Sequence, residues 1–258
     1  MRRLFAVLIG FSAGFLFIIS TPAQESRLGP PPYGDFGPHI FPERDEPVLP
    51  LRLFRREPRV IKKGLLAPPV EVQTAFQGFL QTKDTGLVRL LPSEIYDTGI
   101  PAKNKVKIRG GGAYYSFVNL THQSGFGSDI SLDRDTFSVL FYGLLSNIGD
   151  APLAEIGLDD RRVQPLAAYR PPQRGAAARE DFRRLNSNEG LTLDGAVYHR
   201  RAAVEVNSTY LLRSLVFRQS DVLVAFRVVG KDSDGSVVIV WKLLQRYPTP
   251  KLDLSNKS

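Results

Sequence analysis

The chain has 258 residues and no cysteine, and its 34 lysines and arginines outnumber its 26 aspartates and glutamates, so its formal net charge is +8. The absence of cysteine excludes disulfides, thiolate nucleophiles, cysteine-ligated zinc and iron–sulfur clusters. A chain of this length can bury a core that folds without cross-links, and its positive charge favours anionic partners.

The first 23 residues have the pattern of a secretory signal peptide. Arg2 and Arg3 precede an apolar run over residues 4–19, and a small-residue exit ends at Ala23. We therefore predict an exported protein, periplasmic or secreted, from which residues 1–23 are removed. The alternative is an uncleaved segment that anchors the chain in the membrane, although the run is shorter than the about 20 residues that span a bilayer. Lipid attachment at the cleavage site is excluded because it needs a cysteine.

Prolines are dense over residues 24–69, where the apolar residues show little periodicity. Each proline removes a backbone donor and biases the residue before it to extended conformations, so we predict an extended, semi-rigid arm. Within residues 51–63 the arm carries six basic side chains against the single acid Glu57: Arg52, Arg55, Arg56, Arg59, Lys62 and Lys63.

A second basic cluster, residues 161–184, holds seven arginines against Glu180 and Asp181. Outside the cytoplasm, the polyanions that such clusters attract are anionic lipid headgroups and anionic envelope polymers. We predict a partner of one of these kinds, and export argues against nucleic acid. The alternative is that both clusters are ordinary solvated surface.

Apolar residues recur at helical spacing over residues 70–81 and predict an amphipathic helix that packs on the core. Beyond residue 105 the apolar period becomes two, and we predict strands over residues 113–120, 130–132 and 137–142. Residues 143–188 are less regular, with a predicted helix in the alanine-rich piece 175–185.

The C-terminal third gives the clearest pattern. The pair Asp194-Gly195 predicts a tight hairpin turn, and strands are predicted over residues 204–217, 222–229 and 237–247. The last of these is apolar on both faces, so we expect a central strand covered on both sides, with the helix at 70–81 on one of them. Short connections make the pairing antiparallel.

These elements predict an α+β fold. A single domain over residues 70–248 would contain a mainly antiparallel sheet covered by one or two helices. The Pro-rich arm, residues 24–69, precedes this domain, and a polar tail, residues 249–258, follows it. The alternation of strands with long helices that indicates a Rossmann fold or an α/β barrel is absent.

His122 is the strongest catalytic candidate, because it enters a glycine-containing loop and Asp129 and Asp133 follow closely. A histidine beside carboxylates can perform general acid–base chemistry or bind a metal. The competing interpretation is a strand with one solvated face, since Asp129, Ser131 and Asp133 alternate with apolar residues. The spacing matches no specific metal motif, so we expect neither a metal site nor a cofactor.

The stretch IRGGGAYYSF, residues 108–117, does not fit a phosphate-binding loop, because no lysine follows its glycines and the next residues favour a strand. Arg109, Tyr114 and Tyr115 could instead bind a sugar ring, with the tyrosines packed in the core as the alternative. Residues 232–235, DSDG, lack the distal acid of a calcium loop and predict a hairpin turn.

The sequence therefore combines an export signal with basic clusters and contains no recognisable catalytic constellation. We predict a non-enzymatic ligand- or partner-binding protein of a bacterial envelope. The alternative is an exported hydrolase that uses His122 with Asp129 or Asp133.

Overall fold

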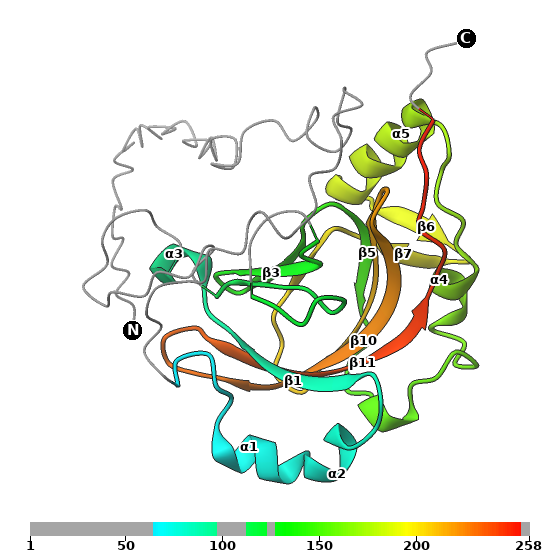
Figure 1. The fold of residues 1–258 in the computed structure, drawn as a ribbon. Helices are drawn as coiled ribbons and strands as arrows, with labels where there is room; N and C mark the ends of the chain where they lie inside the picture. The colour runs from blue at the N-terminus through cyan, green and yellow to red at the C-terminus, as the bar shows by residue number, and fades with distance from the viewer. Residues whose placement is uncertain (1–63, 97–111, 123–126, 254–258) are drawn as a thin grey trace, which may run out of the picture. The chain divides into compact units, whose positions relative to one another are not determined.

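A computed structural model describes residues 64–96, 112–122 and 127–253 of the chain. Two antiparallel sheets form the centre of this part of the chain (Figure 1). The larger sheet has the strand order β1-β11-β10-β9-β5, formed by β1 (Thr85–Leu90), β5 (Tyr142–Asn147), β9 (Thr209–Val216), β10 (Ser220–Lys231) and β11 (Val237–Arg246). The smaller sheet has the order β2-β3-β4-β8, formed by β2 (Tyr114–Tyr115), β3 (Ile130–Asp133), β4 (Thr136–Val139) and β8 (Arg201–Ala203).

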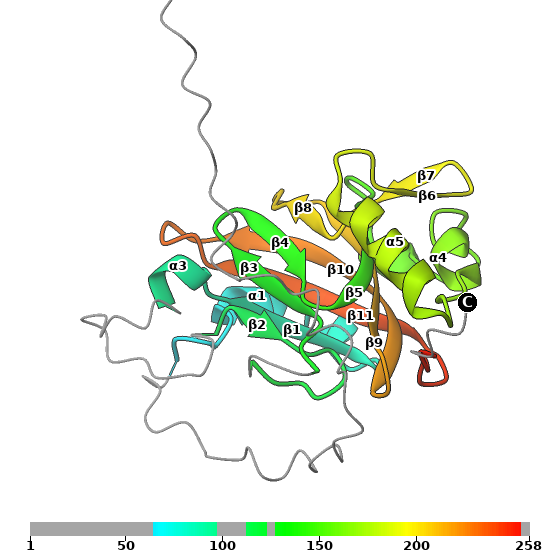
Figure 2. The same ribbon diagram turned by 90° about the horizontal axis from the view of Figure 1, so that it is seen from above.

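The larger sheet curves around the smaller one. In Figure 1, β3 lies on the inner side of the curve, while α1, α2 and α4 lie on its outer side. Figure 2 shows the smaller sheet and α5 from above. The helical elements are α1 (Val70–Ala75), α2 (Gln77–Leu80), α3 (Ser93–Tyr96), η2 (Leu153–Glu155), α4 (Gln164–Ala168) and α5 (Gly175–Asn186), and a hairpin is formed by β6 (Leu191–Leu193) and β7 (Ala196–Tyr198).

Two apolar clusters fill the spaces between these layers. The first lies between the two sheets and includes Phe137 of β4 and Phe226 of β10. The second lies between the outer face of the larger sheet and the elements that cover it, and includes Leu166 of α4, Ala178 of α5 and Leu223 of β10. The larger sheet is therefore buried on both faces.

The last strand has the two apolar faces that its sequence predicts. Val237, Ile239 and Trp241 of β11 belong to the cluster between the sheets, whereas Val240 and Leu244 face the outer cluster. β11 pairs with β1 on one side and with β10 on the other. The prediction of an inner, antiparallel strand covered on both sides is confirmed.

The helix and turn predictions are also confirmed, with one interruption. Residues 70–80 form two short helices, because Phe76 between them leaves helical geometry with φ −102° and ψ 10°. Phe76 and Phe79 pack on the outer cluster. At the predicted hairpin turn, Asp194 and Gly195 have φ of 48° and 81°, the positive angles that a tight turn between two strands requires.

Several strand predictions need correction. The segment predicted over 137–142 is divided between β4 and β5, which belong to different sheets, and the strand predicted over 204–217 begins only at Thr209. The strand predicted over residues 113–120 ends at Tyr115, and residues 117–120 form a turn in which Leu120 has φ 54°. The backbone N–H of Phe117 donates to the carboxylate of Asp129 and not to a neighbouring strand. The irregular region predicted from residue 143 begins instead with β5, which pairs with β9 from a distant part of the sequence.

Gly86 of β1 is pressed against the indole of Trp241 on the neighbouring strand. A Cβ added at Gly86 would lie 2.5 Å from two indole carbons, whereas nothing lies within 4 Å of one added at Gly78 in α2. We expect Gly86→Ala to lower the free energy of unfolding by about 1–3 kcal/mol, because the indole has to move.

The matched control is Gly78→Ala. It should leave the free energy of unfolding unchanged or raise it by up to about 1 kcal/mol, since alanine is favoured over glycine in a helix. Urea denaturation of both variants measures the difference. Equal stability of the two variants would contradict the contact between Gly86 and Trp241.

Candidate functional site

His122 is held by a backbone carbonyl and an aromatic ring. Its Nε2 lies 2.9 Å from the carbonyl oxygen of Arg89 on β1, a geometry in which a protonated Nε2 donates. Its ring meets the ring of Tyr115 edge-on, with centroids 5.2 Å apart. Burial lowers the pKa of His122, and the hydrogen bond to Arg89 offsets only part of this effect. The imidazole is therefore neutral at pH 7.

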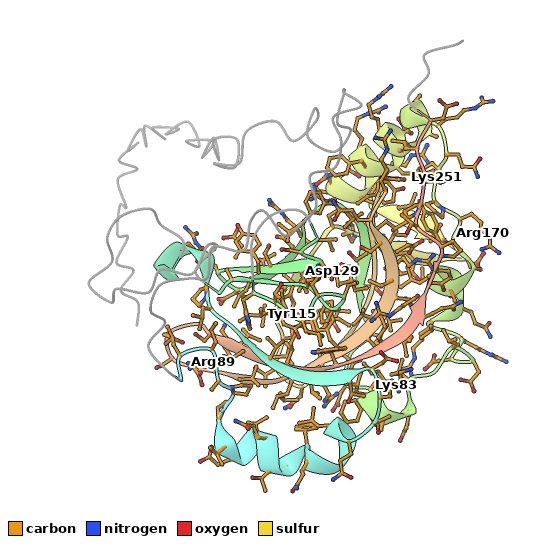
Figure 3. The ribbon with its side chains drawn as sticks, viewed as in Figure 1. Lys83, Arg89, Tyr115, Asp129, Arg170 and Lys251 are labelled. Atoms are coloured by element: carbon orange, nitrogen blue, oxygen red, sulfur yellow. The ribbon has the colours of Figure 1, made fainter. Side chains whose placement is uncertain are left out.

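Asp129 is fully buried and joins the turn after β2 to the larger sheet. Its carboxylate accepts hydrogen bonds from the backbone N–H of Phe117 at 2.7 Å and from the hydroxyl of Ser214 on β9 at 2.6 Å. Burial raises the pKa of Asp129, whereas these hydrogen bonds lower it. Figure 3 shows Asp129 and Tyr115 inside the fold. Asp129 thus organises the turn and the sheet packing.

The third member of the predicted hydrolase site is bound elsewhere. Asp133, at the end of β3, accepts a hydrogen bond from the hydroxyl of Ser93 at 3.1 Å. In the part of the chain that the structure describes, no hydrogen bond or ion pair joins His122 to Asp129 or Asp133. The three side chains are positioned by three separate sets of partners, and the hydrolase stays a prediction.

The two tyrosines proposed for sugar binding are buried. Tyr114 is 7% exposed and Tyr115 is 6% exposed. Tyr115 belongs to the cluster between the sheets, and burial raises its pKa to about 12. Arg109 and the six basic residues of the arm lie outside the described residues, so the binding roles predicted for them stay predictions.

No group of three or more histidine or acidic side chains is arranged to hold a metal ion within the described ranges. None of the helices in those ranges is long and apolar enough to cross a bilayer. The predicted signal segment, residues 1–23, falls outside them.

A buried ion pair joins β9 to β10 beneath α4. Nε and Nη2 of Arg213 donate to the two carboxylate oxygens of Asp221 at 2.5 and 2.9 Å, and both side chains are at most 2% exposed. Nη1 of Arg213 donates to the carbonyl oxygen of Leu166 at 2.9 Å, and its guanidinium lies 3.2 Å from the centre of the Tyr247 ring. The planar fork of this arginine therefore fixes α4 against the sheet.

A second polar cluster fastens α5 to β5. The hydroxyls of Tyr142 and Tyr169 lie 2.5 Å apart, and they donate to the same oxygen of Asp181 at 2.9 and 3.2 Å. Burial raises the pKa of both tyrosines, so both hydroxyls stay protonated. The carboxylate of Asp181 is thereby turned toward the core.

The opposite side of α5 is basic. Arg179, Arg183 and Arg184 are exposed, and the last two share the carboxylate of Glu180. With Arg200, which lies beside the helix, these three arginines form a surface that we call the α5 basic face.

Arg200 makes its hydrogen bonds to neutral groups. Its guanidinium lies 4.4 Å from the centre of the Phe182 ring and donates to Asn186 Oδ1 at 3.0 Å and to the carbonyl oxygen of Val139 at 2.6 Å. Burial, followed by the charge of Arg201, lowers its pKa to about 10. At pH 7 Arg200 is therefore a cation, and no carboxylate in the described part of the chain pairs with it.

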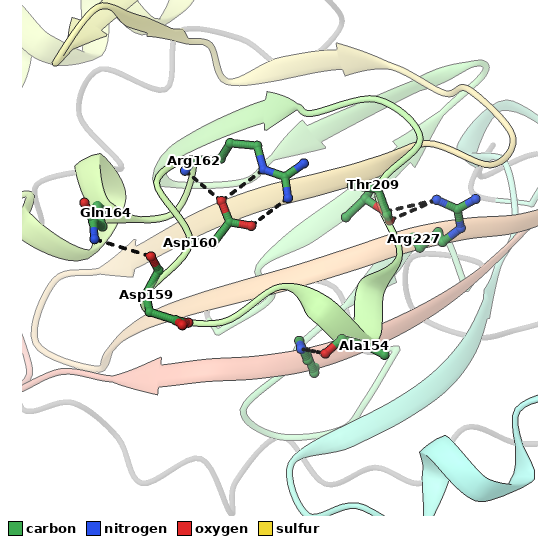
Figure 4. Close-up of polar contacts among 9 residues, drawn as sticks. Ala154, Asp159, Asp160, Arg162, Gln164, Thr209 and Arg227 are labelled. Carbon is green, nitrogen blue, oxygen red and sulfur yellow. Dashed lines mark hydrogen bonds and ion pairs between the residues drawn. The ribbon is translucent and has the colours of Figure 1, made fainter.

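The arginines of residues 161–184 are not equivalent. Arg162 donates through Nε and Nη2 to the carboxylate of Asp160 at 3.0 and 2.6 Å, which lowers the pKa of Asp160 (Figure 4). Figure 4 also shows Arg227 of β10 bound to the hydroxyl of Thr209 at 3.3 Å. Arg162 thus pairs with a carboxylate within its own loop, whereas Arg183 and Arg184 share the single carboxylate of Glu180.

A groove of about 600 Å³ lies between the end of α5 and β6. The charged and hydroxyl side chains that line it are Arg183, Arg184, Glu180, Glu189, Ser187 and Thr192. Its wall includes Gly190, whose φ is 72°. The groove is therefore open to polar ligands beside the α5 basic face.

Comparison with known proteins adds little. No family model matches the chain, and no curated protein is similar to it. A crystal structure of a "putative lipoprotein" from Bacteroides fragilis is 14% identical in sequence to this chain. The alignment covers 65% of this chain and 94% of the lipoprotein chain, with a TM-score of 0.28. A likeness at that TM-score supports no conclusion about fold or function.

The buried polar clusters are not predicted from the sequence, although the sequence holds one signal of the ion pair. Arg213 interrupts the largely apolar run TYLLRSLV, and Asp221 lies at the start of the next strand after a short turn. A charged residue at an inward strand position, with an opposite charge across a hairpin, indicates a buried pair.

Removing one partner of the buried ion pair leaves the other charge uncompensated. We expect Arg213→Met to lower the free energy of unfolding by about 3–5 kcal/mol, because Asp221 stays buried without its cation. The double variant Arg213→Met/Asp221→Leu should recover most of this loss, since apolar side chains can replace a buried pair at little cost. Urea denaturation measures both, and a single variant as stable as the parent would contradict this role.

The lowered pKa of His122 makes the stability of the fold pH-dependent. The unfolded chain takes up a proton at the ordinary histidine pKa of about 6.5, whereas the folded state takes it up only at lower pH. The free energy of unfolding should therefore fall as the pH drops from neutral toward the folded-state pKa. His122→Gln, which keeps a donor for Arg89, should flatten this part of the profile, and an unchanged slope would show that His122 does not contribute.

Proposed function

We propose that this chain is an exported, non-enzymatic protein of a bacterial envelope, and that its α5 basic face binds an anionic envelope polymer or lipid headgroup. The proposal rests on the partners of the two acidic side chains of α5, Glu180 and Asp181. The carboxylate of Glu180 forms ion pairs with two arginines, and the carboxylate of Asp181 accepts hydrogen bonds from two tyrosine hydroxyls. Arg200 donates to neutral acceptors. This side of the molecule keeps an excess of positive charge after folding.

The arginines of the α5 basic face extend from a helix that is held in place by buried hydrogen bonds. Asp181 ties α5 to the tyrosines of the core, and Arg213 ties α4 to the sheet. The α5 arginines therefore extend from a helix whose position is set by buried contacts. Their planar guanidinium groups match carboxylates and phosphates with two parallel hydrogen bonds.

The signal-peptide pattern and the Pro-rich arm also support this function. The signal-peptide pattern of residues 1–23 supports a location outside the cytoplasm. The Pro-rich arm, residues 24–69, would precede a single domain and bring the basic residues of 51–63 to the same class of partner.

Binding to two anionic probes tests the function. The full chain is titrated with phosphatidylglycerol vesicles and with polygalacturonate over a range of salt concentrations. Binding should be strongest at low ionic strength, because exposed charges are screened beyond about 10 Å at 0.1 M salt. Arg179→Gln/Arg183→Gln should weaken binding by about thirtyfold, at roughly 1 kcal/mol for each cation near an anionic surface.

The control removes the same charge elsewhere. Lys83→Gln/Arg161→Gln alters two exposed cations outside the α5 basic face, and Figure 3 shows Lys83 away from α5. We expect this variant to change binding by less than about twofold. The absence of binding to both probes at low salt would overturn the proposed function. An equal loss in the two double variants would overturn the assignment to α5.

A further inference from the structure

The groove between α5 and β6 has a lining of mixed charge. Arg183 and Arg184 supply cationic donors, whereas Glu180 and Glu189 supply anionic acceptors. Thr192 adds a hydroxyl that can donate or accept. A ligand that carried anionic groups alone would meet two glutamates as well as two arginines, so plain positive charge does not describe this groove.

The ion pairs already in the groove are weak enough to be exchanged. Both arginines contact Glu180, but their side chains are 73% and 58% exposed and that of Glu180 is 39% exposed. Ion pairs between side chains as exposed as these contribute roughly 0–1 kcal/mol to the stability of the fold. An incoming carboxylate or phosphate can therefore take over an arginine at small cost and leave Glu180 able to accept a hydrogen bond from the same ligand.

The backbone passes close to the β6–β7 hairpin at the entry to β6, on the wall of the groove. A Cβ added at Gly190 would lie 2.6 Å from a methyl carbon of Val197 and 2.7 Å from Cε1 of His199. Glycine therefore allows the chain to pass close to the hairpin here. The groove volume of about 600 Å³ falls within the about 300–1,000 Å³ that is usual for small-ligand sites.

From this lining we infer that the groove binds an acidic saccharide, a chain of sugars that bear carboxylate or phosphate groups. The inference rests on the proposed function and names the partner class for one part of the α5 basic face. The acidic groups of the sugar pair with Arg183 and Arg184, and its ring hydroxyls donate to Glu180 and Glu189. A lipid headgroup or a polyphosphate chain supplies the anions but few of the hydroxyl donors.

Two substitutions separate saccharide recognition from simple charge attraction. Thr192→Val removes one hydroxyl without changing charge or shape, and Glu189→Gln removes a negative charge. If attraction between opposite charges were the whole cause, Glu189→Gln would tighten binding and Thr192→Val would have no effect. If the groove recognises sugar hydroxyls, both substitutions weaken binding, since each removes a hydrogen-bond partner or its charge.

The experiment is calorimetric titration of the full chain with oligogalacturonate, with polyphosphate of similar charge, and with phosphatidylglycerol vesicles. We expect Thr192→Val and Glu189→Gln each to weaken oligogalacturonate binding by about threefold to tenfold. Neither substitution should weaken polyphosphate or vesicle binding. Ser233→Ala, in the distant turn between β10 and β11, is the control for loss of an exposed hydroxyl and should change nothing.

The outcomes distinguish this inference from the function on which it rests. Loss of oligogalacturonate affinity in both groove variants, with Ser233→Ala unchanged, supports the saccharide site. Tighter binding by Glu189→Gln, or binding to vesicles and polyphosphate alone, would overturn the site while the proposed anionic partner stands. An absence of binding to all three probes would overturn both.

Discussion

The buried ion pair between Arg213 and Asp221 is the interaction on which the outer layer of the structure depends. A guanidinium inside a core is stable only if its donors find acceptors, and here these acceptors come from β10 and α4 while Tyr247 covers its plane. Displacing β10 would leave the buried charge unpaired, and displacing α4 would leave Nη1 of Arg213 without its acceptor. The pair therefore specifies where α4 and the chain after β11 lie on the sheet, beyond what apolar packing alone would select.

The positive charge of the α5 basic face depends on how α5 is held against the core. α5 carries two adjacent acids, and the neighbouring tyrosine hydroxyls turn Asp181 inward. Glu180 is left to serve Arg183 and Arg184, and Arg200 makes its hydrogen bonds to neutral groups. Because Asp181 binds the buried tyrosine hydroxyls, its charge is not available to the arginines on the outer side of α5, and the α5 basic face stays positive. This link joins the stability of the fold to the proposed binding of anions.

The candidate sites show how far residue spacing can predict geometry. His122, Asp129 and Asp133 are close in sequence, but Asp129 is drawn to Ser214, which lies 85 residues further along the chain. His122 is drawn to the carbonyl of Arg89 on β1. Each of these partners comes from a strand whose position is set by sheet pairing, and that pairing is not encoded in local spacing. The tyrosines beside them pack inward for the same reason.

The sequence by itself determined the local elements whose patterns are strong. The two-faced apolar pattern of β11, the helical piece at α5 and the turn at Asp194-Gly195 all follow from periodicity or backbone preference within a few residues. Only the tertiary structure decided the early end of β2, the pairing of β5 with β9 and the inward turn of Asp181. In each of these cases, distant residues supply hydrogen bonds or packing that outweigh the local preference.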